Sequence, residues 1–314
     1  MSGISRRRFL AASLAGTAAT TLTLTKNACG AALLEGYPDG MGVLVDLTRC
    51  IGCRSCEAAC NKEQQLPAPS EPFDDPSVFD RTFHGGTQKR RPDENHLTVV
   101  NRYQPEGQQE PVYRKVQCNH CNEPACLTSC FVNAYTKTSE GAVVYNSKVC
   151  VGCRNCMVAC PFNIPAYSYS SVLNPMVKKC IFCHETRLKN GKPPACVEIC
   201  PQEALTFGYR NDLLKIARER IKMYPGTYVD HIYGEKEVGG TAWMYLSNVP
   251  FDQVGFNTTL QKEPIINNVK DFLSMVPMVL AIWPALFSGF HLLSSRKGNH
   301  DEDHEQPEQE ETRQ

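Results

Sequence analysis

The cysteines constrain this chain more than any other feature, because 16 of the 17 fall into four sets of four. The first set is Cys50-x2-Cys53-x2-Cys56-x3-Cys60, and the third, with the same spacing, is Cys150-x2-Cys153-x2-Cys156-x3-Cys160. The second is Cys118-x2-Cys121-x4-Cys126-x3-Cys130, and the fourth is Cys180-x2-Cys183-x12-Cys196-x3-Cys200. A chain of 314 residues does not need so many covalent crosslinks to fold, so these positions need a chemical explanation.

The spacing of the first and third sets is the one in which three close thiolates bind one [4Fe–4S] cluster and the fourth binds another. Two residues between ligands let a tight loop wrap one face of a cluster and direct backbone amides at its sulfur atoms. The three-residue gap starts a helix that carries the fourth sulfur to a second cluster. Since no set lacks a cysteine, the sequence predicts four [4Fe–4S] clusters bound by these sixteen residues.

An internal repeat supports this prediction. Residues 49–54 (Arg-Cys-Ile-Gly-Cys-Arg) are similar to 149–154 (Val-Cys-Val-Gly-Cys-Arg), and Pro-Ala-Cys occurs at both 124–126 and 194–196. This A-B-A-B order indicates duplication of a two-set unit. Thiolate-bound clusters carry negative charge, so basic residues next to the cysteine sets in the sequence are expected to lie near the clusters. For each single residue, a solvated position on the surface is an equal alternative. The cations are Arg49, Arg54, Lys115, Lys148, Arg154, Lys178 and Lys179.

Zinc and disulfides are the alternative explanations for the cysteines. Zinc usually takes two separated Cys-x2-Cys pairs for each ion, and two Cys-x2-Cys-x2-Cys triplets do not follow that pattern. Disulfides would suit an even number of cysteines in an exported chain. The type of leader argues against them, because the twin-arginine route is associated with export of folded, cofactor-loaded proteins.

Residues 1–32 are predicted to form a twin-arginine signal peptide. Residues 5–10 read Ser-Arg-Arg-Arg-Phe-Leu, an uncharged stretch covers 9–24, and small residues follow at 28–32. An ordinary secretory leader is the alternative. Cys29 could also be a lipoprotein cysteine, but Lys26 and Asn27 stand where apolar residues are wanted. The prediction therefore places the body of the protein outside the cytoplasm.

Residues 272–293 are predicted to form one transmembrane helix, with a buried helix of a soluble protein as the alternative. The 22 residues carry no Asp, Glu, Lys or Arg and reach about 33 Å, enough to cross a bilayer core of about 30 Å. Arg296 and Lys297 follow at once, so the positive-inside rule puts the C-terminus in the cytoplasm. Residues 294–314 are then an acidic cytoplasmic tail.

Between these ends, residues 41–210 are predicted to be the cluster-binding body, with a loop-rich insert at 61–117, and residues 211–270 a C-terminal extension. Apolar patterns predict strands at 97–103, 142–145 and 204–207 and an amphipathic helix at 212–224. His120, His184 and His231 are isolated and are expected to be hydrogen-bonding or surface residues rather than metal ligands.

Composition and motifs limit the function further. Lys+Arg and Asp+Glu are both 33, so no basic field for a nucleic acid is expected. The sequence contains no P-loop, no G-x-S-x-G motif and no dinucleotide-binding fingerprint. The predicted clusters are thus the only redox groups, and the function expected from the residues is electron carriage without a catalytic site of its own.

Residues 114–121 (Arg-Lys-Val-Gln-Cys-Asn-His-Cys) and 150–165 make residues 41–207 resemble the iron–sulfur subunits of the DMSO-reductase type. Residues 233–241, Asn248-Val-Pro-Phe251, the single C-terminal span and the leader resemble one branch, the iron–sulfur subunits of hydrogenase-2 (HybA type). The resemblance implies an α+β fold of two ferredoxin-like [4Fe–4S] modules with loop insertions. It also implies the ligand groups, which are Cys50/53/56 with Cys200, Cys180/183/196 with Cys60, Cys118/121/126 with Cys160, and Cys150/153/156 with Cys130.

The resemblance also implies a function and partners. It indicates an electron-transfer subunit at the periplasmic face of the membrane that links the large and small subunits of a [NiFe]-hydrogenase to an integral membrane, quinone-linked subunit. Two alternatives remain open. One is the same module in a molybdenum or tungsten enzyme such as formate dehydrogenase, and the other is a docking protein stabilised by zinc or disulfides.

Overall fold

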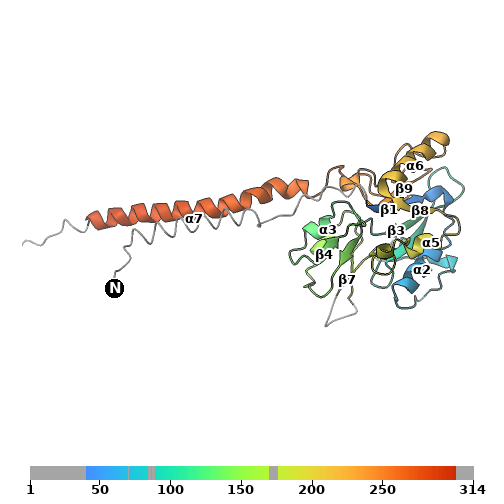
Figure 1. Ribbon diagram of the computed structural model, residues 1–314, viewed down its shortest axis with the longest axis horizontal. Helices are drawn as coiled ribbons and strands as arrows, with labels where there is room; N and C mark the ends of the chain where they lie inside the picture. The colour runs from blue at the N-terminus through green and yellow to red at the C-terminus, as the bar shows by residue number, and fades with distance from the viewer. Residues whose placement is uncertain (1–39, 70, 84–85, 87–88, 170–175, 302–314) are drawn as a thin grey trace, which may run out of the picture. The chain divides into compact units, whose positions relative to one another are not determined.

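The computed structural model describes residues 40–301 except 70, 84–85, 87–88 and 170–175 (Figure 1). The predicted signal peptide, and the predicted tail from residue 302 onward, lie outside the described residues. The chain divides into two compact units, one ending at Pro264 and one beginning at Ile265. Each unit is described by itself.

A three-stranded sheet in the order β8-β1-β9 organises the first unit. Strand β1 (Met41–Asp46) pairs antiparallel with β8 (Leu205–Tyr209) and parallel with β9 (Trp243–Leu246). Val43 of β1 is in register with Phe207 on one side and with Trp243 on the other. The segment after residue 210 therefore completes the same sheet that begins the body of the protein.

The two faces of this sheet bury different cores because successive side chains of a strand point to opposite faces. Leu44 and Met244 face α6 (Arg210–Met223), an amphipathic helix whose Leu213 packs against them. Val43 and Trp243 point to the other face, which carries the larger apolar core. Helix α6 includes the predicted helix at 212–224 except its last residue, and β8 includes the predicted strand at 204–207 except its first, so both predictions are confirmed.

The remaining strands form three antiparallel pairs that frame the cysteine loops. The hairpin of β2 (Thr98–Tyr103) and β3 (Val112–Gln117) lies inside the predicted insert, and β2 confirms the strand predicted at 97–103. The pair of β4 (Tyr135–Lys137) and β5 (Val143–Tyr145) confirms the strand predicted at 142–145. The third pair is β6 (Ala166–Tyr167) with β7 (Val177–Lys178).

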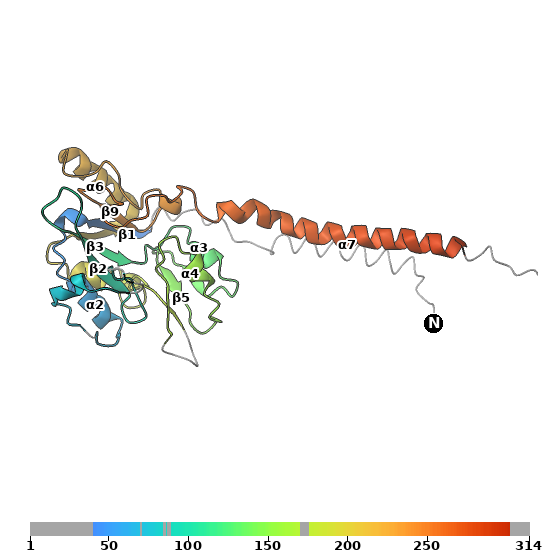
Figure 2. The same ribbon diagram turned by 180° about the vertical axis from the view of Figure 1, so that it is seen from behind.

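Short helices follow the cysteine loops and sort into two groups. Helix α2 (Ser55–Glu63) packs against α5 (Ala195–Glu198), and α3 (Ala125–Thr128) packs against α4 (Asn155–Ala159). Figures 1 and 2 show α2 and α5 together in one lobe of the unit, and α3 and α4 beside β4 and β5 in another. The short 3-10 helices are Leu47–Arg49, Pro76–Asp80, Leu188–Asn190 and Glu237–Gly239.

The second unit is dominated by α7 (Asn267–Asp301), a helix of 35 residues. Its segment Met275–Leu292 has a mean hydropathy of 1.6, and none of it is buried. Length and composition make it the candidate for a membrane span. Pro277 and Pro284 lie inside this helix, as is tolerated in transmembrane helices.

Candidate metal centres

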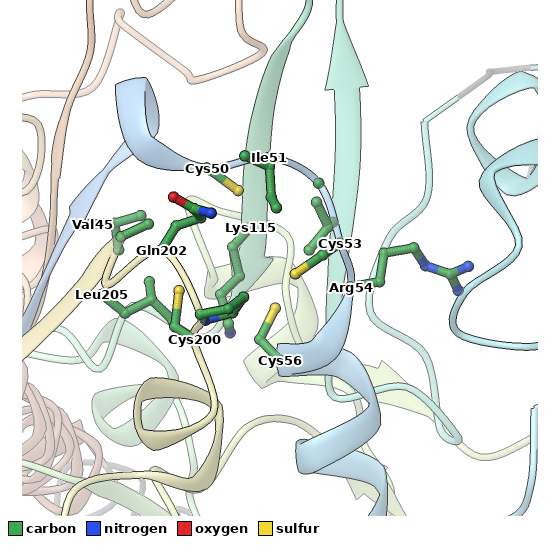
Figure 3. Close-up of a pocket in the computed structure, with 14 residues that line it drawn as sticks. Val45, Cys50, Ile51, Cys53, Arg54, Cys56, Lys115, Cys200, Gln202 and Leu205 are labelled. Carbon is green, nitrogen blue, oxygen red and sulfur yellow. The ribbon is translucent and has the colours of Figure 1, made fainter.

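Four cysteines of two distant sets surround the cavity that we call site I. Cys50, Cys53 and Cys56 come from the first set, and Cys200 comes from the fourth. Apolar side chains such as Val45 and Leu205 line the rest of its wall. Figure 3 shows the four sulfur atoms directed into a common space, with Lys115 reaching in from β3 and Arg54 directed away.

A second cavity, site III, has the same composition. Cys118, Cys121 and Cys126 of the second set line it together with Cys160 of the third set. Burial raises the pKa of the Cys160 thiol to about 11, and the charge of Cys118 adds to this effect. Site III therefore combines three cysteines of one set with the fourth cysteine of another set, as site I does.

The remaining eight cysteines form two further groups. In site II, burial first, and then repulsion from Cys180, Cys196 and Cys183, raises the pKa of Cys60. In site IV, burial and the charges of Cys150, Cys153 and Cys130 raise the pKa of Cys156. These four groups have the same membership as those implied by the family resemblance.

The four sites form a row in the order I–II–III–IV, because one cysteine of each site interacts electrostatically with a cysteine of the next. In each pair, burial is the main cause of the raised pKa of the first cysteine, and repulsion from the second cysteine adds to it. The pairs are Cys56 with Cys196, Cys180 with Cys118, and Cys126 with Cys156. Sites I and II define the first module and sites III and IV the second. Cys53 of site I and Cys153 of site IV are exposed, so each end of the row reaches the surface.

Backbone conformation explains how the short loops turn around a site. Gly52 and Arg54 have φ values of 72° and 60°, and the equivalent residues Gly152 and Arg154 have 71° and 63°. This left-handed backbone favours glycine and curls the loop so that amides face the sulfur atoms. The Gly152 amide, for example, donates a hydrogen bond of 3.4 Å to Cys150 Sγ.

The donor set fits iron–sulfur clusters and does not fit single metal ions. Burial raises the pKa of Cys50 to about 11 and that of Cys180 to about 12, so these thiolates need a strong cationic partner such as iron. Among the described residues, no three Cys, His, Asp or Glu side chains converge tightly enough to hold one ion. A tetrahedral zinc site would require such convergence, whereas a cluster takes each thiolate at a separate iron atom.

Two buried donors support the same interpretation. His120 Nε2 and Trp243 Nε1 are buried, and neither has a hydrogen-bond partner within the described part of the chain. The Val143 amide donates to His120 Nδ1 at 2.9 Å, so the proton of the neutral ring is on Nε2. Buried donors are rarely left unpaired, and the sulfur atoms of a bound cluster are suitable acceptors.

The cations flagged in the sequence divide into two kinds. Lys115 and Lys179 are buried and line sites I and III, respectively. Arg54 is buried but pairs with Glu57, and Arg49 pairs with Glu203 at the surface. Lys148 and Arg154 are exposed, and Lys178 is half-buried.

Lys137 is a buried cation beside site III that the sequence analysis did not identify. Lys137 on β4 donates to the carbonyl oxygens of His120, Cys121 and Gly141 at 2.7–3.0 Å. Burial lowers its pKa to about 8. It lies seven residues after Cys130, the last cysteine of the second set, and so is not adjacent to that set in the sequence.

All three histidines form hydrogen bonds, as predicted. His120 accepts the Val143 hydrogen bond, His184 contacts Glu140 and Glu185, and His231 Nε2 lies 2.7 Å from a Glu237 oxygen.

Comparison with known proteins identifies the family and its cofactor. Residues 49–134 and 110–210 each match a family described as a 4Fe-4S dicluster domain. The fold and its cysteine sites thus define an electron-transfer protein of two dicluster ferredoxin-like domains, which together account for four [4Fe–4S] clusters. The linear matches do not coincide with the spatial modules, because sites I and II combine cysteines of the first and last sets.

Individual relatives extend the match to most of the chain. The chain is 52% identical over 296 residues to a protein of Nitratidesulfovibrio vulgaris, covering 93% of this chain and 77% of that protein. It is 32% identical to hydrogenase-2 operon protein HybA of Escherichia coli O157:H7, covering 80% of this chain and 83% of that protein. It is 30% identical to the iron–sulfur subunit of the nitrate-inducible formate dehydrogenase of E. coli K12, covering 83% of this chain and 87% of that subunit. The chain belongs to the family of HybA-type ferredoxin subunits, and it is an iron–sulfur electron-transfer subunit of an oxidoreductase complex.

Proposed function

We propose that this protein relays electrons between a membrane-bound, periplasmic [NiFe]-hydrogenase and a quinone-linked membrane subunit. The sixteen cysteines of sites I to IV are the proposed ligands, four to each [4Fe–4S] cluster. Bound clusters supply one-electron redox chemistry, and the chain holds them in a fixed order.

The observation that carries the proposal is the row of four sites with a surface-exposed cysteine at each end. Ile51 and Val151 occupy equivalent positions of the repeat beside Cys53 and Cys153, with exposed fractions of 55% and 62%. Exposed apolar side chains at both ends suit two separate protein partners. A relay needs this arrangement, whereas a carrier with one partner would need only one exposed end.

The choice of a hydrogenase rests on the similarity to HybA, which extends over 283 residues and so beyond the cysteine sets. The formate dehydrogenase subunit is similar over a comparable length, so it identifies the second candidate function. The substrate of the catalytic partner is what separates the two.

The proposed location rests on the apolar segment of α7 and on the two basic residues that follow it. The segment Met275–Leu292 is long and apolar enough to cross a membrane, and Arg296 and Lys297 follow it. The positive-inside rule then puts the C-terminus in the cytoplasm and the cluster-binding unit on the periplasmic side. The twin-arginine motif at residues 5–10 supports the same direction.

Deleting the gene tests the relay. Hydrogen oxidation measured with an artificial dye should persist, because the dye takes electrons directly from the hydrogenase. Hydrogen-dependent quinone reduction should be lost and should return with the wild-type gene. Cys153→Ala should fail to restore it fully, whereas Cys29→Ala, a cysteine outside the four sets, should restore it. Loss of formate-dependent electron flow with intact hydrogen metabolism would instead support the second candidate.

A further inference from the structure

Lys115 is a buried lysine between two of the proposed cluster sites. Its relative exposure is 3%, and its side chain extends from β3 into the wall of site I (Figure 3). Its nearest charged neighbours include Cys56 of site I and Cys60, Cys180 and Cys196 of site II. One ammonium group therefore faces thiolates of both sites of the first module.

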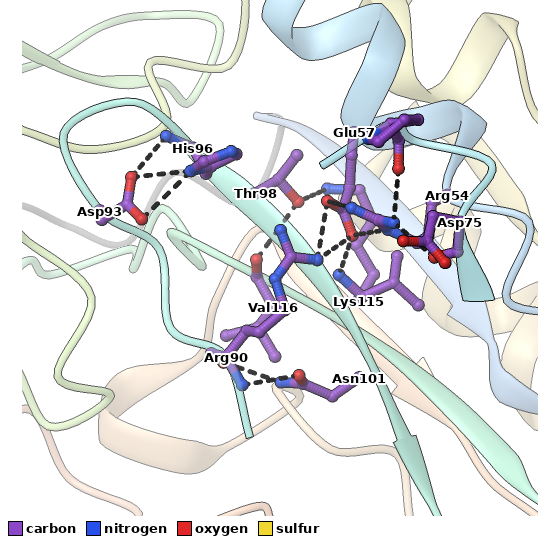
Figure 4. A network of polar contacts seen from close by, with 12 residues as sticks. Arg54, Glu57, Asp75, Arg90, Asp93, His96, Thr98, Asn101, Lys115 and Val116 are labelled. Atoms are coloured by element: carbon purple, nitrogen blue, oxygen red, sulfur yellow. Dashed lines mark hydrogen bonds and ion pairs between the residues drawn. The ribbon is translucent and has the colours of Figure 1, made fainter. Parts of the chain in front are cut away.

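A polar network holds the ammonium group in place. Nζ donates to Thr98 Oγ1 at 2.6 Å (Figure 4). It also donates to Gln117 Oε1 at 3.2 Å. Thr98 Oγ1 donates to the Val116 carbonyl, and Gln117 Nε2 donates to Tyr245 Oη at 2.7 Å. Both oxygens that face Nζ are therefore acceptors, and the lysine supplies the protons.

No carboxylate neutralises this charge. Among the described residues, no Asp or Glu oxygen lies within salt-bridge distance of Lys115 Nζ, and its other close contact is the Trp243 ring, 4.7 Å away. The ammonium group donates to two neutral oxygens in a buried, water-poor region, where charges act strongly on one another.

We propose that Lys115 is a shared counter-cation that raises the midpoint potentials of the clusters at sites I and II. The proposal rests on the proposed ligation of these sites. A fixed positive charge favours the state with one more electron, and nearby charge is one of the factors that set cluster potentials. The step concerned is the transfer of one electron between neighbouring clusters, in which one is oxidised and the other reduced. No bond forms or breaks, and Lys115 keeps its proton.

The second module provides an internal comparison. Lys179 lines site III and lies over the Tyr135 ring, while its Nζ donates to the carbonyl oxygens of Val143 and Cys180. The second module thus has buried lysines of its own, Lys137 and Lys179, and Lys115 should affect the potentials of the first module alone.

Redox titration followed by EPR on the full-length protein tests the proposal. Lys115→Met removes the charge, Lys115→Gln removes it but keeps a hydrogen-bond donor, and Lys115→Arg keeps it. The matched control is Lys215→Met on α6, whose side chain is 69% exposed. In the Met and Gln variants two of the four midpoint potentials should fall, while the other two match the wild type. The Arg variant and the control should leave all four midpoint potentials closer to the wild-type values than the Met and Gln variants do.

Three results would overturn the proposal. One is four unchanged potentials in the Met and Gln variants, and another is an equal shift of all four. The third is loss of clusters from both charge-removing variants, which would make Lys115 an assembly residue. Iron content of the wild-type protein separates this outcome from failure of the ligation proposal, which requires about sixteen iron atoms per chain.

Discussion

The rings of His120 and Phe182 are stacked, with centroids 4.8 Å apart and an interplanar angle of 19°. His120 lies between Cys118 and Cys121, and Phe182 lies between Cys180 and Cys183. The contact therefore joins the loops of sites II and III, where the two modules meet.

Replacing Phe182 by Ala should destabilise this junction. The side chain is fully buried and also contacts Trp243, so its removal leaves a cavity and costs about 3–5 kcal/mol. The apparent melting temperature of the iron-loaded protein should fall clearly. Phe131→Ala is the matched control, because Phe131 is 67% exposed and its truncation should change the melting temperature little. Equal effects of the two variants would contradict the role of the junction.

Glu57 should be essential for stability although it binds no cluster. Its carboxylate accepts hydrogen bonds from Arg90 at 2.9 Å and from the Val100 amide at 2.6 Å, and it pairs with Arg54 (Figure 4). Glu57→Gln leaves two buried guanidinium groups without a counter-charge, which costs about 3–5 kcal/mol. Anaerobic urea unfolding should show a lower midpoint.

The control for Glu57 is Glu198→Gln. Glu198 pairs with Arg187, but its side chain is 59% exposed, so its loss should cost no more than about 1 kcal/mol. A Glu57→Gln midpoint as high as that of the control would show that the buried network adds no stability.

Gly52→Ala should impair cluster binding at site I. An added Cβ would lie 2.3 Å from the Tyr113 ring, and the φ of 72° is already unfavourable for alanine. Gly191→Ala is a matched control, since its φ is 68° but nothing lies within 4 Å of the added atom. Iron analysis should show a deficit for Gly52→Ala alone. If both variants bound iron fully, close packing at Gly52 would not matter for the site.

The two exposed ends should serve different partners. Ile51→Glu and Val151→Glu each place a charge in an exposed apolar position beside one terminal site. Loss of an interface contact costs on the order of 1–2 kcal/mol, so each variant should weaken one association about tenfold while sparing the other. Co-purification with the catalytic and membrane partners measures this. If both variants affected the same partner, the proposal of one partner at each end of the row would be wrong.

Ending the chain at Pro264 should release the protein from the membrane. The cluster-binding unit ends there as a compact body, and the apolar helix α7 begins after it. The truncated chain should appear in the soluble fraction with its iron retained, whereas the full chain should sediment with membranes. A truncated chain that still sediments would place the attachment in the cluster-binding unit.

Local sequence was sufficient for the features that depend on near neighbours. Three strands and helix α6 follow from apolar periodicity, because burial of one face repeats within a few residues. The spacing of Cys50, Cys53 and Cys56 likewise indicates cluster chemistry, since a single short loop presents all three thiolates. The match to 4Fe-4S dicluster domains confirms this inference about the cofactor.

Tertiary structure alone decided which distant residues meet. Cys200 joins Cys50, 150 residues earlier in the chain, only because β1 pairs with β8, and β9 reaches the same sheet from the C-terminal extension. The cations show the same limit. Arg54 and Lys115 both stand near cysteine sets in the sequence, yet Arg54 turns to Glu57 while Lys115 faces sites I and II. Which charge reaches a buried site depends on packing between strands far apart in the chain, and local spacing carries no information about that packing.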